Sequence, residues 1–308
     1  MDMGEADCVR LCWKIARGCV KMNTSDYEKF IGDKGSQVRI LLIRHGMTQG
    51  NKEHRYVGTT DEELLPESVE QLRCMREFWQ KQVSMKDGDG ILCDGPVLVS
   101  NPMVNLSDGP VLVSNPTVNL CEESEKNVID NLTVYVSPYL RAKQTADILF
   151  PDAKQVEIAE FAEFRFGAFE YKNYAELNGN PDYQRFIDSG GTTAFPGGES
   201  RAEFTERVMR GFDKMLADVE EKQRLTQDSE NWNEPKTRKM LTETESVRSY
   251  TIVVVAHGGT IMALMDQLSE PHKDYFDWQV KPGEGVAGIL QVNEDSGLLI
   301  SDTICLKK

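Results

Sequence analysis

The sequence has little positive charge for its size. Its 35 lysines and arginines stand against 50 aspartates and glutamates, and the net charge at pH 7 is −15. Proteins that bind nucleic acids in a general way owe their affinity for phosphate backbones to clustered lysine and arginine. The composition therefore excludes a general nucleic-acid binder. It also implies that an anionic substrate must be met by a local group of cations.

Long hydrophobic runs are also missing. A mixed run at 9–20 is interrupted by Lys14, Arg17 and Gly18, which fits neither a signal peptide nor a membrane span. The seven cysteines are an odd number without metal-type spacing, a pattern typical of reduced thiols in the cytosol. We therefore expect a soluble cytoplasmic protein with no membrane partner.

The chain of 308 residues, 40% of them hydrophobic, is long enough for one large domain with a sizeable core. Residues 1–36 are interpreted as an N-terminal extension, either an amphipathic helix packed on the domain or a loose segment. Residues 37–308 are interpreted as one domain with insertions at about 86–131 and 220–249. The second insertion is so polar that we expect a loop or an extended helix end.

The first insertion contains a tandem repeat. Residues 94–106 recur as residues 108–120, and the two copies differ only at Met103 against Thr117. Two copies are too few for a solenoid, which needs three or more repeats to bury a core. We interpret the repeat as a surface excursion resembling a hairpin.

Strands and helices alternate along the predicted domain. The expected strands are 38–43, 133–136, 155–158, 251–256, 286–292 and 298–303, and the expected helices are 67–83, 139–150, 200–219 and a segment after 258. This alternation predicts an α/β fold, a three-layer α/β/α sandwich with a mostly parallel central sheet. The aromatic-rich stretch 161–195 is interpreted as a cap over the strand ends or as core filling.

Two of the expected strands end in a His-Gly pair, at His45 and at His257. The carboxyl ends of parallel strands meet at one edge of a sheet, where open α/β folds place their ligands. The other two histidines, His54 and His272, lie in polar loop-like contexts and are interpreted as surface residues. The sequence therefore predicts a site that contains the first two histidines.

Donor groups accompany these histidines. Arg44 precedes His45, Asn51 follows in the next loop, and Arg141 lies about one helical turn after the second expected strand. The group has several donors and few acceptors. Guanidinium groups bind phosphoryl oxygens in a bidentate manner and keep their charge at any ordinary pH. These residues predict a phosphoryl group as the ligand.

Six motifs follow one another along the chain. They are Arg44-His45-Gly46-Met47-Thr48 with Asn51, then residues 56–61, residues 137–146, Glu163 before Phe166-Gly167, Gly197-Gly198-Glu199-Ser200, and Ala256-His257-Gly258-Gly259. In this order they resemble the histidine phosphatase superfamily, with its phosphoglycerate-mutase-like fold, and within it the branch that includes α-ribazole phosphatase. The resemblance covers about residues 38–303 apart from the two insertions.

The resemblance implies a phosphomonoesterase for a small organic phosphate ester, such as an α-ribazole phosphate, that needs no metal and no cofactor. His45 would be the nucleophile that carries the phosphoryl group as a phosphohistidine. Glu163 would be the general acid and base. The implied set for binding the phosphoryl oxygens is Arg44, Arg141, Asn51 and His257, with further hydrogen bonds from Thr48, Gly46 and Gly258.

Three positions depart from the family pattern. Met47 stands where the family commonly has an acidic residue, Ala162 where it has an arginine, and Arg165 where it has an acidic residue.

Other readings of the site residues stay open. Arg141 could serve only as a helix cap, and Glu163 could be an ordinary solvated carboxylate. Two functional alternatives stay open: a phosphoglycerate-type mutase, which returns the phosphoryl group to product, and a weakly catalytic binding protein that uses the tandem repeat as an interaction arm.

Overall fold

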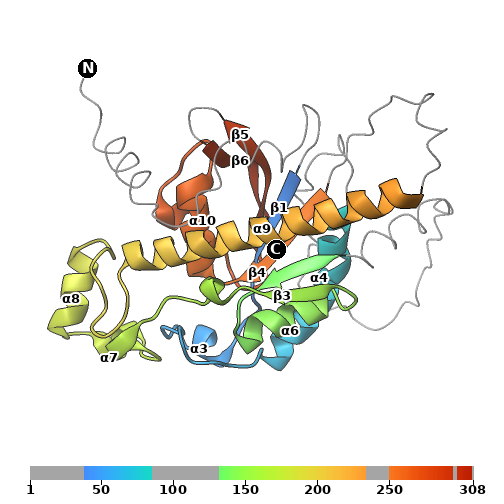
Figure 1. Ribbon diagram of the computed structural model, residues 1–308. Coiled ribbons are helices and arrows are strands. Elements are labelled where there is room, and N and C mark those ends of the chain that lie inside the picture. The colour runs from blue at the N-terminus through green and yellow to red at the C-terminus, as the bar shows by residue number, and fades with distance from the viewer. Residues whose placement is uncertain (1–37, 85–131, 234–249, 294–296, 307–308) are drawn as a thin grey trace, which may run out of the picture.

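The computed structural model describes residues 38–84, 132–233, 250–293 and 297–306 (Figure 1). The expected N-terminal extension, 1–36, and the tandem-repeat insertion, 86–131, lie outside these residues. The described residues form the expected mixed α/β fold.

Within the described residues, six strands form one sheet in the order β3-β2-β4-β1-β5-β6. They are β1 (Val38–Arg44), β2 (Thr133–Val136), β3 (Lys154–Glu157), β4 (Tyr250–Ala256), β5 (Gly285–Asn293) and β6 (Gly297–Leu306). Strands β3, β2, β4 and β1 are parallel, β5 is antiparallel to β1, and β6 is antiparallel to β5. All the expected strands are confirmed, with ends that differ by a few residues.

The helices also follow the expected order. They are α3 (Gln49–Lys52), α4 (Pro66–Ser84), α6 (Leu140–Leu149), α7 (Tyr174–Leu177), α8 (Pro181–Asp188), α9 (Arg201–Asn233) and α10 (Gly258–Leu268), with short 3₁₀ turns at Ala159–Phe161, Gly167–Phe169 and Tyr275–Trp278. The sequence analysis does not predict α3 and α7, which have four residues each and are too short to show a period. It also does not predict α8, which lies within the aromatic-rich stretch. None of the described helices combines the length and apolar character needed to cross a bilayer.

One face of the sheet is covered by α4 and α6. Successive side chains of a strand point to opposite faces, and Leu41 and Ile43 of β1 pack on this side. They share a buried cluster with Leu72 and Trp79 of α4 and Ala146 of α6. The apolar stripe of α4 is therefore the surface that meets the sheet.

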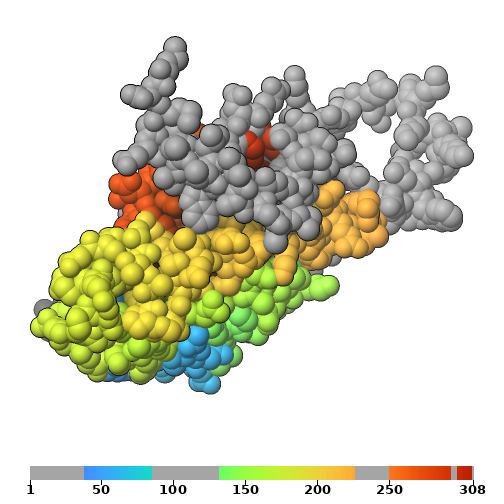
Figure 2. Space-filling model, turned by 60° about the vertical axis from the view of Figure 1, so that its left-hand side comes forward, coloured from blue at the N-terminus to red at the C-terminus, as the bar shows by residue number. Residues whose placement is uncertain are grey.

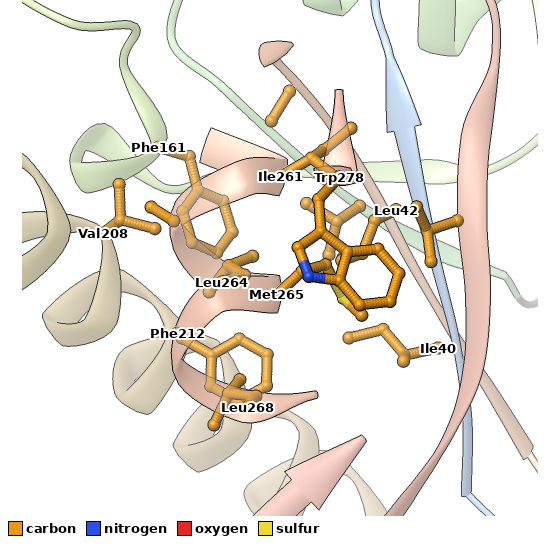
Figure 3. Packing of buried hydrophobic residues seen from close by; sticks show 14 of the residues in the cluster. Ile40, Leu42, Phe161, Val208, Phe212, Ile261, Leu264, Met265, Leu268 and Trp278 are labelled. Atoms are coloured by element: carbon orange, nitrogen blue, oxygen red, sulfur yellow. The ribbon is translucent and has the colours of Figure 1, made fainter. Parts of the chain in front are cut away.

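The opposite face is covered by α9 and α10. Ile40 and Leu42 of β1 point to this side, into a cluster with Phe212 of α9 and Leu264 of α10. Figure 3 shows these side chains together with Trp278, which belongs to the same cluster. The sheet therefore lies between two helical layers, which confirms the expected three-layer sandwich.

Helix α9 is longer than the sequence predicts. The expected end near residue 219 is wrong, because the helix continues to Asn233 and crosses the molecule in Figure 1. Val219 is still buried against the core, and Lys222 pairs with Asp218 one turn earlier. Such i,i+4 ion pairs support an exposed helix after its apolar face has ended. Of the two readings of 220–249, the extended helix end is the one observed as far as residue 233.

Residues 170–195, here called the cap, contain α7 and α8 and form one end of the molecule (Figure 2, yellow-green). No side chain of α8 is fully buried. Phe195 is buried, and its ring packs 4.3 Å from that of Phe186 between ring centroids. Phe161 instead belongs to the core beneath α9 and α10. The aromatic-rich stretch thus serves both as cap and as core filling.

Candidate active site

The two strand-end histidines lie next to each other. His45 follows β1, His257 follows the adjacent β4, and the His45 amide donates to the carbonyl of Ala256 at 2.9 Å. Their ring centroids are 5.0 Å apart, with the ring planes at 66°. Both are buried, with 2% and 0% of their surface exposed. His54 and His272 are exposed, as the sequence predicts.

His45 is held in one tautomer. Its Nδ1 lies 2.6 Å from the carbonyl oxygen of Gly46, and because a carbonyl can only accept, Nδ1 must carry the proton. Burial, followed by the charges of Arg141 and Arg44, lowers the pKa of His45 well below 6.5. At neutral pH the ring is therefore uncharged and keeps a lone pair on Nε2. The Gly46 amide already donates to Thr145 Oγ1 at 2.9 Å, so Gly46 acts on the site through its carbonyl.

His257 is uncharged for similar reasons. Burial, and then the charge of Arg141 and the proximity of His45, lowers its pKa well below 6.5. Its Nε2 lies 2.6 Å from the hydroxyl of Ser137, and the edge of the Tyr139 ring packs against it with centroids 5.5 Å apart. Its Nδ1 is buried and has no hydrogen-bond partner within the described part of the chain.

Arg141 is fully buried and is held by backbone carbonyls. Its Nη1 donates to Thr60 at 2.8 Å and its Nη2 to Gly58 at 3.0 Å. The ring of Tyr139 lies 4.6 Å from the guanidinium carbon. Burial lowers the pKa of Arg141, and the nearby Glu163 carboxylate acts against this shift. The carbonyls orient the guanidinium without neutralising its charge.

Arg44 adds a second cation, which is partly buried. Its Nη1 donates to the carbonyl of Val280 at 2.7 Å, and its guanidinium lies against Gly258, where a Cβ would be 3.3 Å from Cζ. Neither Arg44 nor Arg141 forms an ion pair with a carboxylate of the described residues. Buried charges are normally paired, so these two cations mark a site for an anion.

Glu163 reaches the same site from the loop after β3. Its Oε1 accepts from the Phe164 amide at 2.8 Å, and its Oε2 lies 3.4 Å from the Gly259 amide at the start of α10. Burial raises the pKa of this carboxyl above its usual range, against the opposing effects of the Phe164 amide, Arg141 and Arg44. A Cβ at position 259 would stand 2.3 Å from Oε1. The second glycine after His257 therefore makes room for this carboxylate.

The neighbouring glutamates have other partners. Glu157 pairs with Lys143, Glu160 pairs with Lys214, and Glu170 accepts from the amides of Gly58 and Thr60. Glu163 therefore differs from the glutamates around it in contacting the helix that follows His257. In the sequence, only the family resemblance separates Glu163 from the other three carboxylates.

Thr48, Asn51 and Gly258 occupy helix starts. Thr48 is buried and caps α3: its hydroxyl accepts from the Asn51 amide at 3.4 Å, and Asn51 Oδ1 accepts from the Thr48 amide at 3.4 Å. Among the described residues, these two side chains bond to each other's backbone and not to His45 or His257. Gly258 is the first residue of α10, where backbone N–H groups lack intrahelical acceptors and favour anions.

Two further side chains, which have no role among the predicted site residues, support the site. Arg207 of α9 donates to the carbonyls of Glu160, Ala162 and Glu163 at 2.8, 2.9 and 3.2 Å. It also forms an ion pair with the buried Glu199 at 2.5 Å. Arg207 thereby fixes the backbone that presents Glu163. The Gly-Gly-Glu-Ser motif signals Glu199, but no local pattern signals an arginine whose partners are distant carbonyls.

The chain resembles known proteins in sequence and in fold. The family model of the histidine phosphatase superfamily (branch 1) matches residues 40–86 and 120–226. An Escherichia coli protein described as an α-ribazole-5'-P phosphatase is 18% identical, with 88% of this chain and 96% of that chain covered and a TM-score of 0.54. The α-ribazole phosphatase of Shigella flexneri is 19% identical, with 88% and 96% covered and a TM-score of 0.52. Such identities show a shared fold. No curated protein sequence matches the chain.

Proposed function

The chain belongs to the histidine phosphatase superfamily, and we propose that it hydrolyses phosphate monoesters through a phosphohistidine on His45. The observation that carries the proposal is the state of His45. Its Nδ1 proton is held by the carbonyl of Gly46, and its low pKa leaves a lone pair on Nε2 beside two cations. A neutral imidazole in this state is an activated nucleophile.

In the first half-reaction, the Nε2 lone pair of His45 attacks phosphorus and the bond from phosphorus to the ester oxygen breaks. The leaving oxygen takes a proton from the Glu163 carboxyl, whose raised pKa favours the protonated form. The ring then bears a positive charge, which the bond from Nδ1 to Gly46 stabilises. The products of this step are a phosphohistidine, a free alcohol and a Glu163 carboxylate.

In the second half-reaction, the Glu163 carboxylate takes a proton from water as the water oxygen attacks phosphorus. The bond from phosphorus to Nε2 breaks, its electron pair returns to the ring, and phosphate leaves. Glu163 is again protonated and His45 is again neutral. One carboxyl thus serves as acid and then as base, which returns the site to its starting state.

Arg44, Arg141, the His257 Nδ1 and the start of α10 are proposed to bind the phosphoryl oxygens. Phosphoryl transfer depends mainly on positioning and on stabilising charge that spreads over these oxygens. The two guanidinium groups supply fixed positive charge. Because no carboxylate of the described residues pairs with them, this charge is left for the phosphoryl group. We assign Thr48 and Asn51 to the edge of the substrate site, with the Asn51 side-chain amide as a donor.

The proposed substrate is a small organic phosphate ester, with α-ribazole phosphate as the first to be tested. Support comes from the names of the two fold neighbours, which are described as α-ribazole phosphatases. Met47 and Arg165 depart from the family pattern near the site, so a panel of other phosphate esters belongs in the same screen.

The proposal is tested by hydrolysis of p-nitrophenyl phosphate in excess EDTA. We expect turnover by the wild type, none above background by His45→Ala, and wild-type turnover by His54→Ala, which removes an exposed histidine. Trapping of 32P on the wild type but not on His45→Ala would identify the phosphohistidine. Turnover that survives in His45→Ala would refute the mechanism.

The same preparation separates the alternatives. Interconversion of 3-phosphoglycerate and 2-phosphoglycerate after priming with 2,3-bisphosphoglycerate, with little release of inorganic phosphate, would identify a mutase. No turnover of any ester and no label on His45 would favour the weakly catalytic binding protein, and a pull-down with and without residues 87–131 would then test the interaction arm.

We also propose a cytoplasmic location. Support comes from Cys74 and Cys305, which are free thiols, as expected for a protein in a reducing compartment. Thiol titration of the protein as purified from reducing cytosol, compared with that after reduction, tests the proposal. An increase in thiol count after reduction would contradict it.

A further inference from the structure

Ser137 and His257 form a buried pair. The proposed reaction gives a role to His257 and none to Ser137. Ser137 follows β2, His257 follows β4, and the two strands are parallel neighbours. The Ser137 amide donates to the carbonyl of Val255 at 3.1 Å, which sets the serine beside the histidine. Neither side chain is exposed to solvent. Ser137 Oγ lies 2.6 Å from His257 Nε2.

The other contact of the hydroxyl fixes the direction of this hydrogen bond. The Tyr139 amide lies 3.4 Å from Ser137 Oγ and can only donate to it. If His257 Nε2 donated as well, the serine proton would be buried with no acceptor in the described part of the chain, which native structures rarely allow. Ser137 therefore donates to Nε2, and the proton of the neutral ring lies on Nδ1.

This Nδ1 is the atom that the chain leaves unpartnered. It is buried and bonds to none of the described residues. The ring stands 5.0 Å from that of His45, between centroids, in the site that also holds Arg44 and Arg141. An N–H group aimed at an anion site is a ready donor to a phosphoryl oxygen. In the other tautomer, Nδ1 would present a lone pair to the same oxygen and repel it.

We propose that Ser137 is a positioning residue: its hydroxyl donates to the unprotonated Nε2 of His257 and so holds the ring as the Nδ1–H tautomer. The two adjacent imidazoles then take opposite roles. His45, whose Nδ1 proton is bound by Gly46, presents a lone pair at Nε2. His257, whose Nε2 is occupied by Ser137, presents a proton at Nδ1. The role of that proton rests on the proposed function, whereas the tautomer is a property of the resting protein.

The test is long-range 1H–15N correlation spectroscopy of the full chain with 15N-labelled histidine. Ring nitrogens that carry a proton resonate far from those that do not. In the wild type at neutral pH, we expect a protonated Nδ1 and an unprotonated Nε2 for both His45 and His257, because both rings are neutral. The two rings differ in which nitrogen is bound to protein, and removal of Ser137 tells them apart.

Ser137→Ala removes the donor to Nε2. We expect both nitrogens of His257 to move toward intermediate positions as the second tautomer becomes populated, while those of His45 stay in place. Ser137→Thr, which keeps a hydroxyl, should restore the wild-type pattern. The matched control is Ser68→Ala, which removes a buried hydroxyl that accepts from Met47 and not from His257; it should leave the His257 signals unchanged.

Kinetics give the second measurement. With p-nitrophenyl phosphate, Ser137→Ala should lose about tenfold to a hundredfold in kcat/KM, somewhat less than the loss of a whole oxyanion donor, and Ser137→Thr should recover most of it. A protonated Nε2 on wild-type His257, or a Ser137→Ala spectrum identical to the wild type, would overturn the proposal. If Ser137→Ala does not fold, the wild-type spectrum decides. The predicted tautomer in a wild type without turnover would support the assignment and refute the proposed function.

Discussion

The strand-end site and the cap are held by different forces. In the site, Arg141 and His257 are fully buried, and backbone carbonyls and a single hydroxyl set their orientation. In the cap, α8 has no fully buried side chain, and Phe186 packs against the tilted ring of Phe195. Sheet register therefore positions the first region, and ring packing positions the second.

This difference predicts two kinds of mutational effect. Polar groups in the site are preorganised by rigid strands, so a change there should remove transition-state stabilisation. The cap contributes buried apolar surface, so a change there should mainly reduce the free energy of unfolding. The following predictions test this contrast from the largest effect to the smallest.

Glu163→Gln should have the largest effect. With an alkyl phosphate, whose leaving group must be protonated, kcat/KM should fall by about 10²–10⁴-fold, and with p-nitrophenyl phosphate kcat/KM should fall by much less. The reactive form of Glu163 is the protonated carboxyl. Wild-type kcat/KM for the alkyl ester should therefore decline as pH rises through the raised pKa of Glu163. The variant should lack that decline. Glu160→Gln, which changes a carboxylate paired with Lys214, is the control, and an equal loss there would contradict the assignment.

Arg141→Lys should reduce kcat/KM by about 10²–10³-fold. A lysine keeps the charge but cannot bind two carbonyls and two phosphoryl oxygens in one plane. The control is Arg165→Lys, at a largely exposed arginine that pairs with Glu199, where we expect a change of no more than about threefold. Equal losses in the two variants would remove the distinction between site and periphery.

Phe195→Ala should reduce the free energy of unfolding by about 3–5 kcal/mol, because its buried ring packs against Phe164, Phe166 and Phe186. Urea denaturation measures this. Tyr174→Ala, which changes a cap residue with 70% of its surface exposed, should stay within about 0.5 kcal/mol of the wild type. A small loss at Phe195 would show that the cap is not held by its rings.

Acid should destabilise the site through its two histidines. Their folded pKa values lie below 6.5, so the unfolded chain binds protons first and stability falls as pH drops below about 6.5, by at most about 1.4 kcal/mol per pH unit for each histidine. Glu163, with its raised pKa, works in the opposite direction and offsets at most one of them. Urea unfolding at pH 7.5 and 5.5 measures the net loss.

Two variants sharpen this measurement. His257→Gln should reduce the pH dependence of stability, because one buried titrating ring is removed. His54→Gln should leave it unchanged, since His54 is exposed. Equal pH dependence in all three proteins would show that the buried histidines do not carry the effect.

Much of the fold and part of the site follow from local patterns. The β-rich runs that became β1 and β4 are long and apolar enough to be assigned, and the residues that follow them place His45 and His257 at one sheet edge. The sequence leaves open whether the helix continues after residue 219, because exposed polar residues in a helix resemble those in a loop. Helix α7 is too short to carry a measurable period, whereas the Asn180 cap and Pro181 at the start of α8 are a local helix signal within the aromatic-rich stretch.

The sequence by itself determined the order of strands and helices, the three-layer class and the residue types at the site, because these depend on periodicity and on motifs that are local in the chain. Only the tertiary structure decided which glutamate meets α10, which carbonyls orient Arg141, and which nitrogen of each histidine is occupied. Each of these depends on atoms brought together across the sheet by strand register. No local pattern records a contact between residues that are more than a hundred positions apart, such as Ser137 and His257.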